Sequence, residues 1–386
     1  GEDGFVVGAQ GLGDEADALG AERLAEAGEV DRPLHAERER DDADCGQGPG
    51  DPPRGMEELA RLLDRPGHGR IVLFRQAPGE QGRTNAKDSV ISTIPDDNKA
   101  ALTRIEVELE RHIAGAGLGG DLSVGLREAM AYAVLGGGKR LRPLLVWLAS
   151  EAVGGEVEKC LPAAAAVEFV HAFSLVHDDL PAMDDDDLRR GRPTLHVHTN
   201  EAMAILAGDA LLNLAFAAVL ETDASDAVRV ALVRELSRGC AGMISGQVYD
   251  TMPELDPEAD DRRRLERIHV NKTGALIRAS ARLGGVCGGA STEQLEALTA
   301  YADAVGHMFQ AVDDLLDVEQ SAEQTGKRTG KDAEAGKLTY PGLLGVDGTR
   351  AEVARLLGEA ERAIGVLGEK GATLGAIARQ MASRDR

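Results

Sequence analysis

Several residue types that mark particular protein classes are scarce in this chain of 386 residues. Aromatic residues make up only 3%, and the four cysteines are scattered without the spacing of metal ligands. Acidic residues outnumber basic ones, which gives a formal net charge of −23. This charge argues against nucleic acid or an anionic membrane surface as a partner. The cysteine pattern favours a reduced, cytoplasmic setting.

Long apolar runs are also missing: none reaches the roughly 18 residues of a membrane span, and no secretory signal is apparent. Instead, Ala, Leu, Val and Gly dominate, and alternating β-branched patterns are rare. This composition predicts an all-α protein. Residues 201–220 predict a long buried helix, within which Asp209 and Asn213 would hydrogen-bond to neighbouring helices.

The first 95 residues differ in composition from the rest of the chain. They are rich in Gly, Asp, Glu and Ala and show little apolar periodicity. Such a segment cannot bury enough surface to offset the loss of chain entropy on folding. We therefore expect a low-complexity, disordered extension at residues 1–95 and a helical domain at residues 96–386. Two origins stay open for the extension, a dispensable native tail or a mis-assigned gene start with Met56 as a candidate.

An acidic stretch stands out within the helical domain, because six aspartates lie within ten positions and arginines follow directly. The residues are Asp178, Asp179, Asp184 to Asp187, Arg189, Arg190 and Arg192. Crowded carboxylates repel one another, and oxygen ligands without cysteine suit Mg²⁺ or Ca²⁺ rather than zinc. Because the guanidinium fork matches phosphate, the stretch predicts a metal-bridged phosphate ligand rather than a solvated turn. Pro181 is expected to kink the chain and return Asp184 to Asp178.

A second acidic cluster lies far along the chain, at Asp313, Asp314 and Asp317. Positions four apart share a helix face, so Asp313 and Asp317 point the same way. Here the sequence resembles the trans-polyprenyl (isoprenyl) diphosphate synthase family, and is most similar to the bacterial type of farnesyl diphosphate synthase. The family signatures are DD-x(2 or 4)-D-x4-R-R-G and DD-x-x-D, and both are present, at residues 178–191 and 313–317.

The resemblance implies a prenyltransferase that condenses isopentenyl diphosphate head-to-tail with dimethylallyl and geranyl diphosphates to give farnesyl diphosphate. It implies a single large helical bundle of the isoprenoid synthase type around a central cavity. It also implies about three Mg²⁺ ions per site and a homodimer. The expected partners are therefore small diphosphates, with neither nucleic acid nor a membrane span.

The resemblance also assigns roles to individual residues. Catalysis is assigned to Asp178, Asp184, Asp313, Lys272 and Arg189. The metal ligands are Asp178, Asp179, Asp184, Asp313, Asp314 and Asp317. The allylic diphosphate is bound by Arg189, Lys272, Thr273, Gln310, Lys327 and Lys337. Lys327 and Lys337 belong to a glycine-broken basic loop that is expected to close over phosphate as a lid.

Three glycines lead into basic residues where a helix is expected to start, at Gly136 to Arg142. Free backbone N–H groups and two charges there suit an anion, although a simple basic turn explains the pattern equally well. The family has G-G-K-R-x-R-P at this place. The resemblance thus implies an isopentenyl diphosphate site formed by Gly138, Lys139, Arg142, His171 and Arg190.

Product length is predicted from Phe173 and Ser174, just before the first acidic cluster. Phe173 lies five residues before Asp178, roughly 7.5 Å along a helix axis, where a phenyl ring would form the floor of a tunnel. Relatives with longer products tend to have smaller residues at this level, so the resemblance implies a C15 product. The alternative is that Phe173 packs between helices and the floor lies elsewhere.

Three other functions stay open. A geranyl or geranylgeranyl diphosphate synthase of the same family would share these motifs. A terpene cyclase has no need of the isopentenyl site and carries N-D-x-x-S-x-x-x-E where this chain has DDLLD. A non-catalytic subunit of a heteromeric synthase typically loses an acidic motif, whereas both motifs are intact here.

Overall fold

The computed structural model describes residues 98–115, 122–255, 260–325 and 338–384, with the side chains of residues 319–325 excepted. All of these residues belong to the second of the two units into which the chain divides, residues 71–386. The predictions made for residues 1–95, and for Lys327 and Lys337 in the basic loop, lie outside the described residues.

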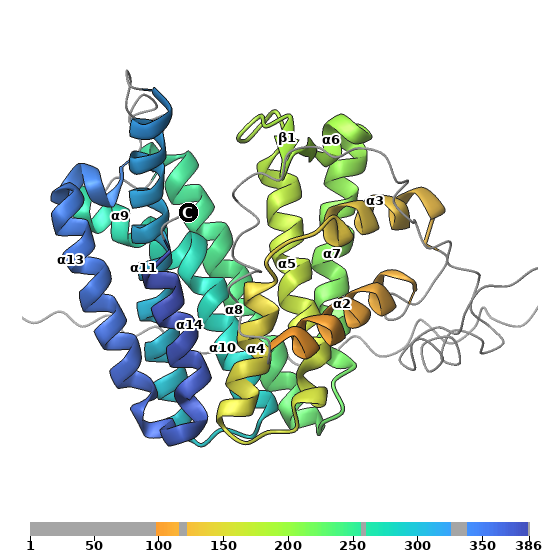
Figure 1. Cartoon of the computed structure of the whole chain (residues 1–386). Coiled ribbons are helices and arrows are strands. Elements are labelled where there is room, and N and C mark those ends of the chain that lie inside the picture. The colour runs from red at the N-terminus through yellow and green to blue at the C-terminus, as the bar shows by residue number, and fades with distance from the viewer. Residues whose placement is uncertain (1–97, 116–121, 256–259, 326–337, 385–386) are drawn as a thin grey trace, which may run out of the picture. The chain divides into compact units, whose positions relative to one another are not determined.

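The described residues are almost entirely helical, which confirms the all-α prediction (Figure 1). The α-helices are α2 (Lys99–Ile113), α3 (Val124–Leu135), α4 (Leu141–Ala152), α5 (Leu161–Asp178), α6 (Leu195–His198), α7 (Glu201–Leu220), α8 (Asp226–Thr251), α9 (Asp261–His269), α10 (Ala275–Cys287), α11 (Thr292–Thr325), α13 (Tyr340–Ala363) and α14 (Ala372–Ala382). Shorter turns of other helix types are η3 (Val157–Cys160), η4 (Pro253–Leu255), η5 (Val270–Gly274) and η6 (Ile364–Gly371). The strands β1 (Leu188–Arg189) and β2 (Arg192–Pro193) form a small antiparallel hairpin that the sequence did not predict.

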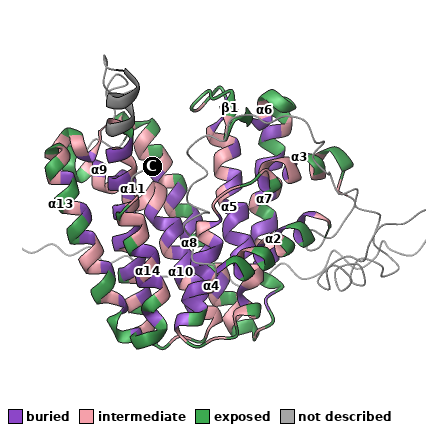
Figure 2. Cartoon of the chain, viewed as in Figure 1, coloured by how far each residue is buried: buried purple, intermediate pink, exposed green. Residues whose placement is uncertain are grey.

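Two neighbouring hydrophobic clusters form the core. The first is centred on α5 and α7 and includes Phe169 and Leu211, and the second surrounds Tyr301 on α11. The Tyr301 hydroxyl donates to the Leu374 carbonyl at 2.8 Å, so the buried phenol keeps a partner on α14. Figure 2 shows that α4, α5 and α10 are mostly buried, whereas α2 and α13 expose their outer sides. The central helices are therefore fixed from several sides.

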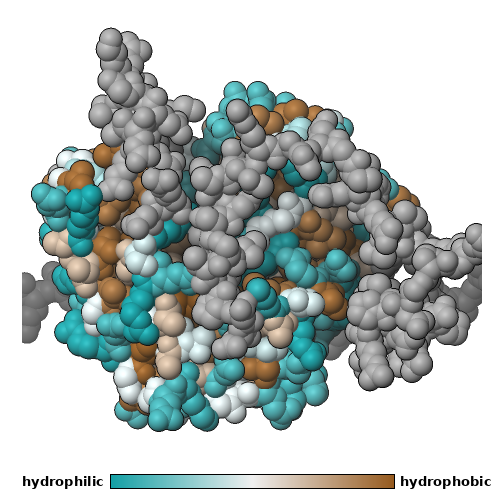
Figure 3. Space-filling model, viewed as in Figure 1, coloured by the Kyte–Doolittle hydropathy of each residue, from teal (hydrophilic) through white to brown (hydrophobic). Residues whose placement is uncertain are grey.

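Over the outer helices α13 and α14, hydrophilic and hydrophobic residues are interleaved on the face seen in Figure 3.

A close approach between α8 and η5 sets the position of Lys272. A Cβ atom added to Gly246 would overlap the backbone nitrogen of Lys272. Glycine at this position therefore lets η5 lie directly against the end of α8. The five residues Val270–Gly274 form a π-helical turn, a geometry that often occurs at functional sites.

The prediction of a long helix at residues 201–220 is confirmed, but the helix is buried on one face only. Asp209 and Asn213 are exposed, as are Leu206 and Leu220 with exposed fractions of 57% and 53%, while the opposite face, with Leu211, lies in the core. The helix is apolar on nearly every side, so its periodicity does not indicate which face meets the protein.

Two helical segments are long and apolar enough to cross a membrane by length and composition, Val157–Asp178 and Glu201–Leu220. Within the described residues, 67% of the first apolar window and 44% of the second are buried inside the protein. A buried core helix meets the same criteria, so these two helices are weak evidence for a membrane span.

Candidate active site

The two acidic clusters lie at the same end of the helical unit. The first follows the end of α5, and the second lies in the last third of α11. Figure 1 shows that both helices run toward the end of the unit at which the β1–β2 hairpin lies. This placement agrees with the expectation that both clusters serve one site.

Asp184 returns to the end of α5, as the position of Pro181 predicted. The backbone N–H of Asp184 donates to the carbonyl of Asp178 at 2.8 Å. Burial, with the nearby carboxylates of Asp184 and Asp179, raises the pKa of Asp178 to about 6, although Lys272 and Arg189 oppose the rise. A carboxylate in this environment is stabilised by an added cation, because burial and like charges both penalise its ionised form.

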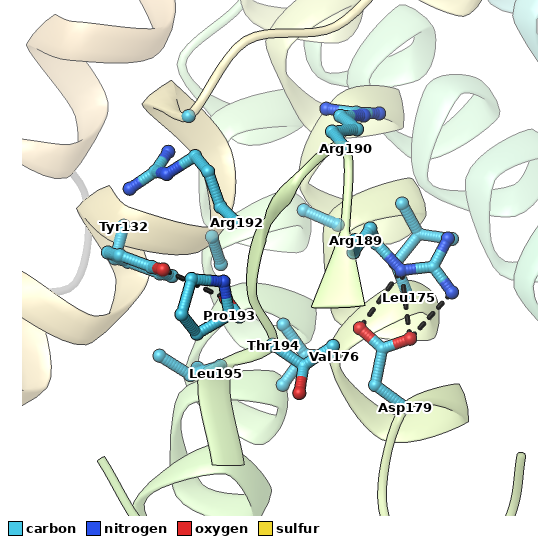
Figure 4. A pocket seen from close by; sticks show the side chains of 13 residues that line it. Tyr132, Leu175, Val176, Asp179, Arg189, Arg190, Arg192, Pro193, Thr194 and Leu195 are labelled. Carbon is cyan, nitrogen blue, oxygen red and sulfur yellow. Dashed lines mark hydrogen bonds and ion pairs between the residues drawn. The ribbon is translucent and has the colours of Figure 1, made fainter. Parts of the chain in front are cut away.

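Asp179 points to a different partner from Asp178. Its buried carboxylate accepts hydrogen bonds from Arg189, at 2.6 Å from Nη2 to Oδ1 and 2.9 Å from Nε to Oδ2 (Figure 4). The resemblance assigned Asp179 to a metal, whereas here the carboxylate holds the first arginine of the hairpin. The hydrogen bonds raise the pKa of Arg189 against the effect of burial, so this arginine stays charged beside the acidic cluster.

The rest of the hairpin is seated against α3 and α5 around a small cavity (Figure 4). The Tyr132 hydroxyl donates to the Pro193 carbonyl at 2.8 Å, and the Arg192 guanidinium lies 4.1 Å from the centre of the Tyr132 ring. The cavity is bounded on α5 by Ala172, Val176 and Asp179. These contacts fix the turn that presents Arg189 and Arg190.

Cations gather on the neighbouring part of the site, where the resemblance placed isopentenyl diphosphate. Nη1 of Arg142 lies 3.4 Å from Nε2 of His171, and Arg190 donates to the Gly137 carbonyl. Burial lowers the pKa of His171 well below its usual range, and Arg142 and Arg190 lower it further. The neutral ring can therefore accept from Arg142. Gly138 has a φ of 156°, a backbone conformation that favours glycine.

This cation cluster has the properties of an anion site. Among the described residues, no carboxylate is hydrogen-bonded to Arg142 or Arg190. Burial lowers the pKa of both the Arg142 and the Arg190 guanidinium groups. The positive charge of Arg190 lowers the pKa of Arg142 further. Lys139 lies half-buried on the same turn. A bound anion would relieve this repulsion, so the predicted residues are brought together as expected.

Three of the residues assigned to the allylic diphosphate, Lys272, Thr273 and Gln310, lie where η5 packs against α8 and α11. Nζ of Lys272 donates to Oδ2 of Asp250 at 2.6 Å, and the Thr273 hydroxyl donates to Oε1 of Gln310 at 2.7 Å. Lys272 also lies close enough to Asp178 to oppose the rise of its pKa. The sequence analysis gave Asp250 no role, and its contact with Lys272 depends on the packing of α8 against η5.

The second acidic cluster makes contacts of its own. Nη1 of Arg384, near the end of the chain, lies 3.8 Å from Oδ1 of Asp313. Asp314 accepts from the backbone N–H of Tyr340 at 2.8 Å, at the start of α13, and Asp317 is exposed. Sequence analysis did not assign Arg384, because nothing in a local pattern connects the chain end to α11.

The donor set fits Mg²⁺ that is shared with a diphosphate. Among the described residues, no group of three Asp, Glu, His or Cys side chains is placed to hold an ion unaided. Mg²⁺ commonly binds through one or two carboxylates together with water and substrate phosphate oxygens. The carboxylates of the two motifs that suit this mode are Asp178, Asp179, Asp184, Asp313, Asp314 and Asp317. Asp179 and Asp314 each accept a hydrogen bond from another residue.

Comparison with known proteins agrees with this chemistry. A family model described as polyprenyl synthetase matches residues 124–367. Geranylgeranyl pyrophosphate synthase 11 (chloroplastic) of Arabidopsis thaliana is 46% identical over 268 residues, which cover 67% of this chain and 74% of the relative. The heterodimeric geranylgeranyl pyrophosphate synthase large subunit 1 (chloroplastic) of the same plant is 46% identical over 267 residues, covering 67% and 72%. The crystal structure of an FPP/GFPP synthase from Zymomonas mobilis matches with a TM-score of 0.65 and 34% identity, covering 74% of this chain and 99% of that chain.

The contact between Asp179 and Arg189 predicts a loss of stability in Asp179→Asn. The amide cannot replace the charge, and Arg189 loses its partner in a partly buried place, so we expect a loss of about 2 kcal/mol. The measurement is the free energy of unfolding in urea. Asp186→Asn, in the exposed part of the same stretch, is the control and should change it by less than about 0.5 kcal/mol. Equal values for the two variants would contradict a structural role for Asp179.

Proposed function

The chain belongs to the polyprenyl synthetase family and is a prenyltransferase, and from this premise we propose that its product is farnesyl diphosphate. Isopentenyl diphosphate is condensed first with dimethylallyl diphosphate and then with geranyl diphosphate. The observation that supports this condensation is that two separate groups of charged side chains lie in one site, whereas the product length rests on Phe173. One group is the cation cluster of Arg142, His171 and Arg190, and the other surrounds Lys272 and Asp178.

In the proposed reaction the C1–O bond of the allylic diphosphate breaks, and its electron pair leaves with the diphosphate. Lys272 and Arg189 lie beside Asp178 and offer donors to that departing charge, which lowers the energy of the transition state. The double bond of isopentenyl diphosphate then forms a carbon–carbon bond with the allylic cation. This bond formation leaves a cation on C3 of the isopentenyl unit, and loss of a proton from C2 to the departed diphosphate forms the new double bond.

We assign Asp178, Asp184, Asp313 and Asp317 to Mg²⁺. The ions, when bound, supply the positive charge that stabilises a leaving diphosphate. Asp179 and Asp314 are proposed as further ligands, which also hold Arg189 and the start of α13. Lys327 and Lys337 remain proposed ligands of the allylic diphosphate.

Lys139, Arg142, His171 and Arg190 are proposed to hold isopentenyl diphosphate. The arginines supply charge, and the neutral imidazole of His171 supports Arg142 without adding to the repulsion. Because this cluster is distinct from the groups around Lys272, two diphosphates can bind at once. Simultaneous binding brings the two reacting carbons together, which is the main requirement of a condensation between two substrates.

The farnesyl length is supported by how Phe173 is held. Its side chain is buried, and its ring meets the His177 ring edge-on at 5.6 Å between centres. Nε2 of His177 lies 3.1 Å from the Ile205 carbonyl, and a Cβ atom at Gly208 would overlap this imidazole. The ring of Phe173 is thus backed by α7 and is not free to move aside. Ser174, the other residue predicted to set the product length, donates to the His171 carbonyl of its own helix at 2.9 Å.

Geranylgeranyl diphosphate is the second candidate product. It is favoured by the printed names of the Arabidopsis relatives, which are 46% identical to this chain. Under this alternative the chemistry is the same, and the elongating chain passes Phe173.

A homodimer is proposed through the outer faces of α7 and α8, which pack against each other. Leu206 and Leu220 are exposed on α7, and Val230 and Ile244 are 56% and 48% exposed on α8. Burial of these side chains against a second copy removes apolar surface from water. The printed name of one relative, a heterodimeric large subunit, makes a different partner the alternative.

Two further proposals concern the location of the protein and the part of the chain that carries the activity. A cytoplasmic location is consistent with Cys160, Cys240 and Cys287 being free thiols, while the Arabidopsis relatives are named chloroplastic. The helical domain from about residue 96 is proposed to carry the whole activity.

Loss of a metal-site carboxylate should abolish turnover without unfolding the protein. We expect Asp178→Ala and Asp313→Ala to lower kcat by at least ~100-fold, because the leaving charge loses stabilisation. Turnover is measured with labelled isopentenyl and dimethylallyl diphosphates and Mg²⁺, with circular dichroism in parallel. Asp347→Ala, whose side chain is 99% exposed, is the matched control. A wild-type protein that forms no new carbon–carbon bond would refute the proposed function.

Phe173→Ala should lengthen the product to C20 or beyond, because the ring that blocks the growing chain is removed. Product chromatography with dimethylallyl and isopentenyl diphosphates gives the length directly. Phe173→Tyr keeps a ring of similar size and should still give C15. An unchanged C15 product from the alanine variant would exclude Phe173 as the floor, and C20 from the wild type would favour the geranylgeranyl alternative.

Leu206→Glu should convert a dimer into a monomer, because it places a charge in the proposed apolar interface. The measurement is the molar mass by light scattering at micromolar concentration. Val107→Glu alters another solvent-exposed apolar residue, which lies on α2 (44% exposed), and should leave the mass unchanged. A wild type that is monomeric by itself would instead point to a different partner for this face.

A further inference from the structure

Arg140 lies in the same turn as Lys139 and Arg142, but its side chain serves the interior of the protein. The side chain is only 3% exposed, and all three guanidinium nitrogens donate to other groups of the chain. Nε and Nη2 donate to Glu106 at 2.7 and 3.2 Å, and Nη1 donates to Glu168 at 2.7 Å. Nη2 also donates to the Val134 carbonyl at 2.8 Å. Four of the five N–H groups of Arg140 therefore donate to other groups of the chain.

These partners come from three different elements. Glu106 belongs to α2, the Val134 carbonyl to the last turn of α3, and Glu168 to α5. Arg140 itself is the residue that precedes α4. One buried side chain therefore joins the start of α4 to α2, α3 and α5. Glu106 and Glu168 keep this buried guanidinium charged, because they raise its pKa against the effect of burial.

The backbone at Arg140 is in a conformation that residues with a side chain rarely adopt. Its φ and ψ angles are 48° and 32°, in the left-handed region, and they follow positive φ angles at Gly137 and Gly138. Such a conformation persists in a residue other than glycine only where the surrounding structure enforces it. The hydrogen bonds of the Arg140 side chain supply that enforcement.

The same two elements, the start of α4 and the middle of α5, also form the cation cluster. Glu168 and His171 are three residues apart on one face of α5. Glu168 binds Arg140, while His171 contacts Arg142 at 3.4 Å. The contact with Glu168 neutralises the charge of Arg140, whereas the contact with His171 leaves Arg142 positive. A shift of Arg140 would therefore move Arg142 relative to His171.

From this geometry we propose that Arg140 is a positioning residue for the isopentenyl diphosphate site. Its contacts with Glu106 and Glu168 hold the turn in which Lys139 and Arg142 face the diphosphate. The inference rests on the proposed function, because it concerns the affinity of that site for one of the two substrates. The groups around Lys272 lie away from this turn, because Lys272 and Thr273 are on η5 and Asp178 is at the end of α5, beyond Glu168.

Two substitutions separate the backbone from the side chain. Arg140→Gly accommodates the left-handed conformation without strain but removes all the side-chain contacts. Arg140→Lys keeps a charge for Glu168 but cannot bridge both glutamates. We expect both variants to raise the KM for isopentenyl diphosphate by ~10-fold to ~100-fold, since misplacement of binding groups by fractions of an ångström has effects of this size. The KM for the allylic diphosphate and kcat at saturation should change by less than ~3-fold.

Two further variants complete the experiment. Arg104→Lys alters an arginine on α2 that pairs with Glu158 at 3.0 Å on the surface, and should leave both KM values unchanged. Glu106→Gln removes the negative charge and one of the two acceptor oxygens that face Arg140. The Glu106 side chain is 41% exposed, so this variant is expected to fold even where the Arg140 variants do not. It should raise the KM for isopentenyl diphosphate by ~3-fold to ~10-fold.

The outcomes are distinct. A folded Arg140→Gly with an unchanged KM for isopentenyl diphosphate overturns the inference, as does an equal rise for both substrates. If the Arg140 variants fail to fold, an unchanged KM in Glu106→Gln overturns it. A wild type without prenyl transfer refutes the proposed function and this inference with it, whereas an active wild type with unaffected variants refutes this inference alone.

Discussion

Repulsion between like charges is the constraint on which the rest of the site depends. Arg142 and Arg190 are held near each other without a hydrogen-bonded carboxylate, and Asp178 lies beside Asp184 with its pKa raised to about 6. Neither group would stay in place by itself. Each adjoins a charged side chain that is paired inside the protein, since Arg140 binds Glu106 and Glu168, and Arg189 binds Asp179. Unsatisfied charges thus face the ligands, and satisfied ones face the protein.

The sequence predicted best those features that depend on local spacing. The return of Asp184 to Asp178 follows from Pro181 a few residues earlier, and the helical fold follows from composition and periodicity. The family was recognised from two short motifs, and the match to polyprenyl synthetase confirms it. The meeting of Thr273 with Gln310 could be expected only from the family resemblance, because no local pattern connects two residues on different helices.

The features that the sequence did not predict depend on packing between residues that are far apart in the chain. Asp178 and Asp179 are adjacent and chemically identical, yet one faces the site and the other binds Arg189. The difference arises because the hairpin folds back onto α5, which no local signal announces. Similarly, Arg140 looks like one of three equivalent cations in its motif, and only its burial beside Glu106 and Glu168 distinguishes it from Arg142.

Helix α7 links the proposed product length to the proposed association of subunits. Its inner side carries Gly208, against which His177 packs and so supports Phe173. Its outer side exposes Leu206 and Leu220. Protein interiors are close-packed, so a displacement of one side of a helix is felt at the other. A partner that moved α7 would therefore also move the floor that Phe173 forms. For this reason, the product length and the state of association have to be measured on the same sample.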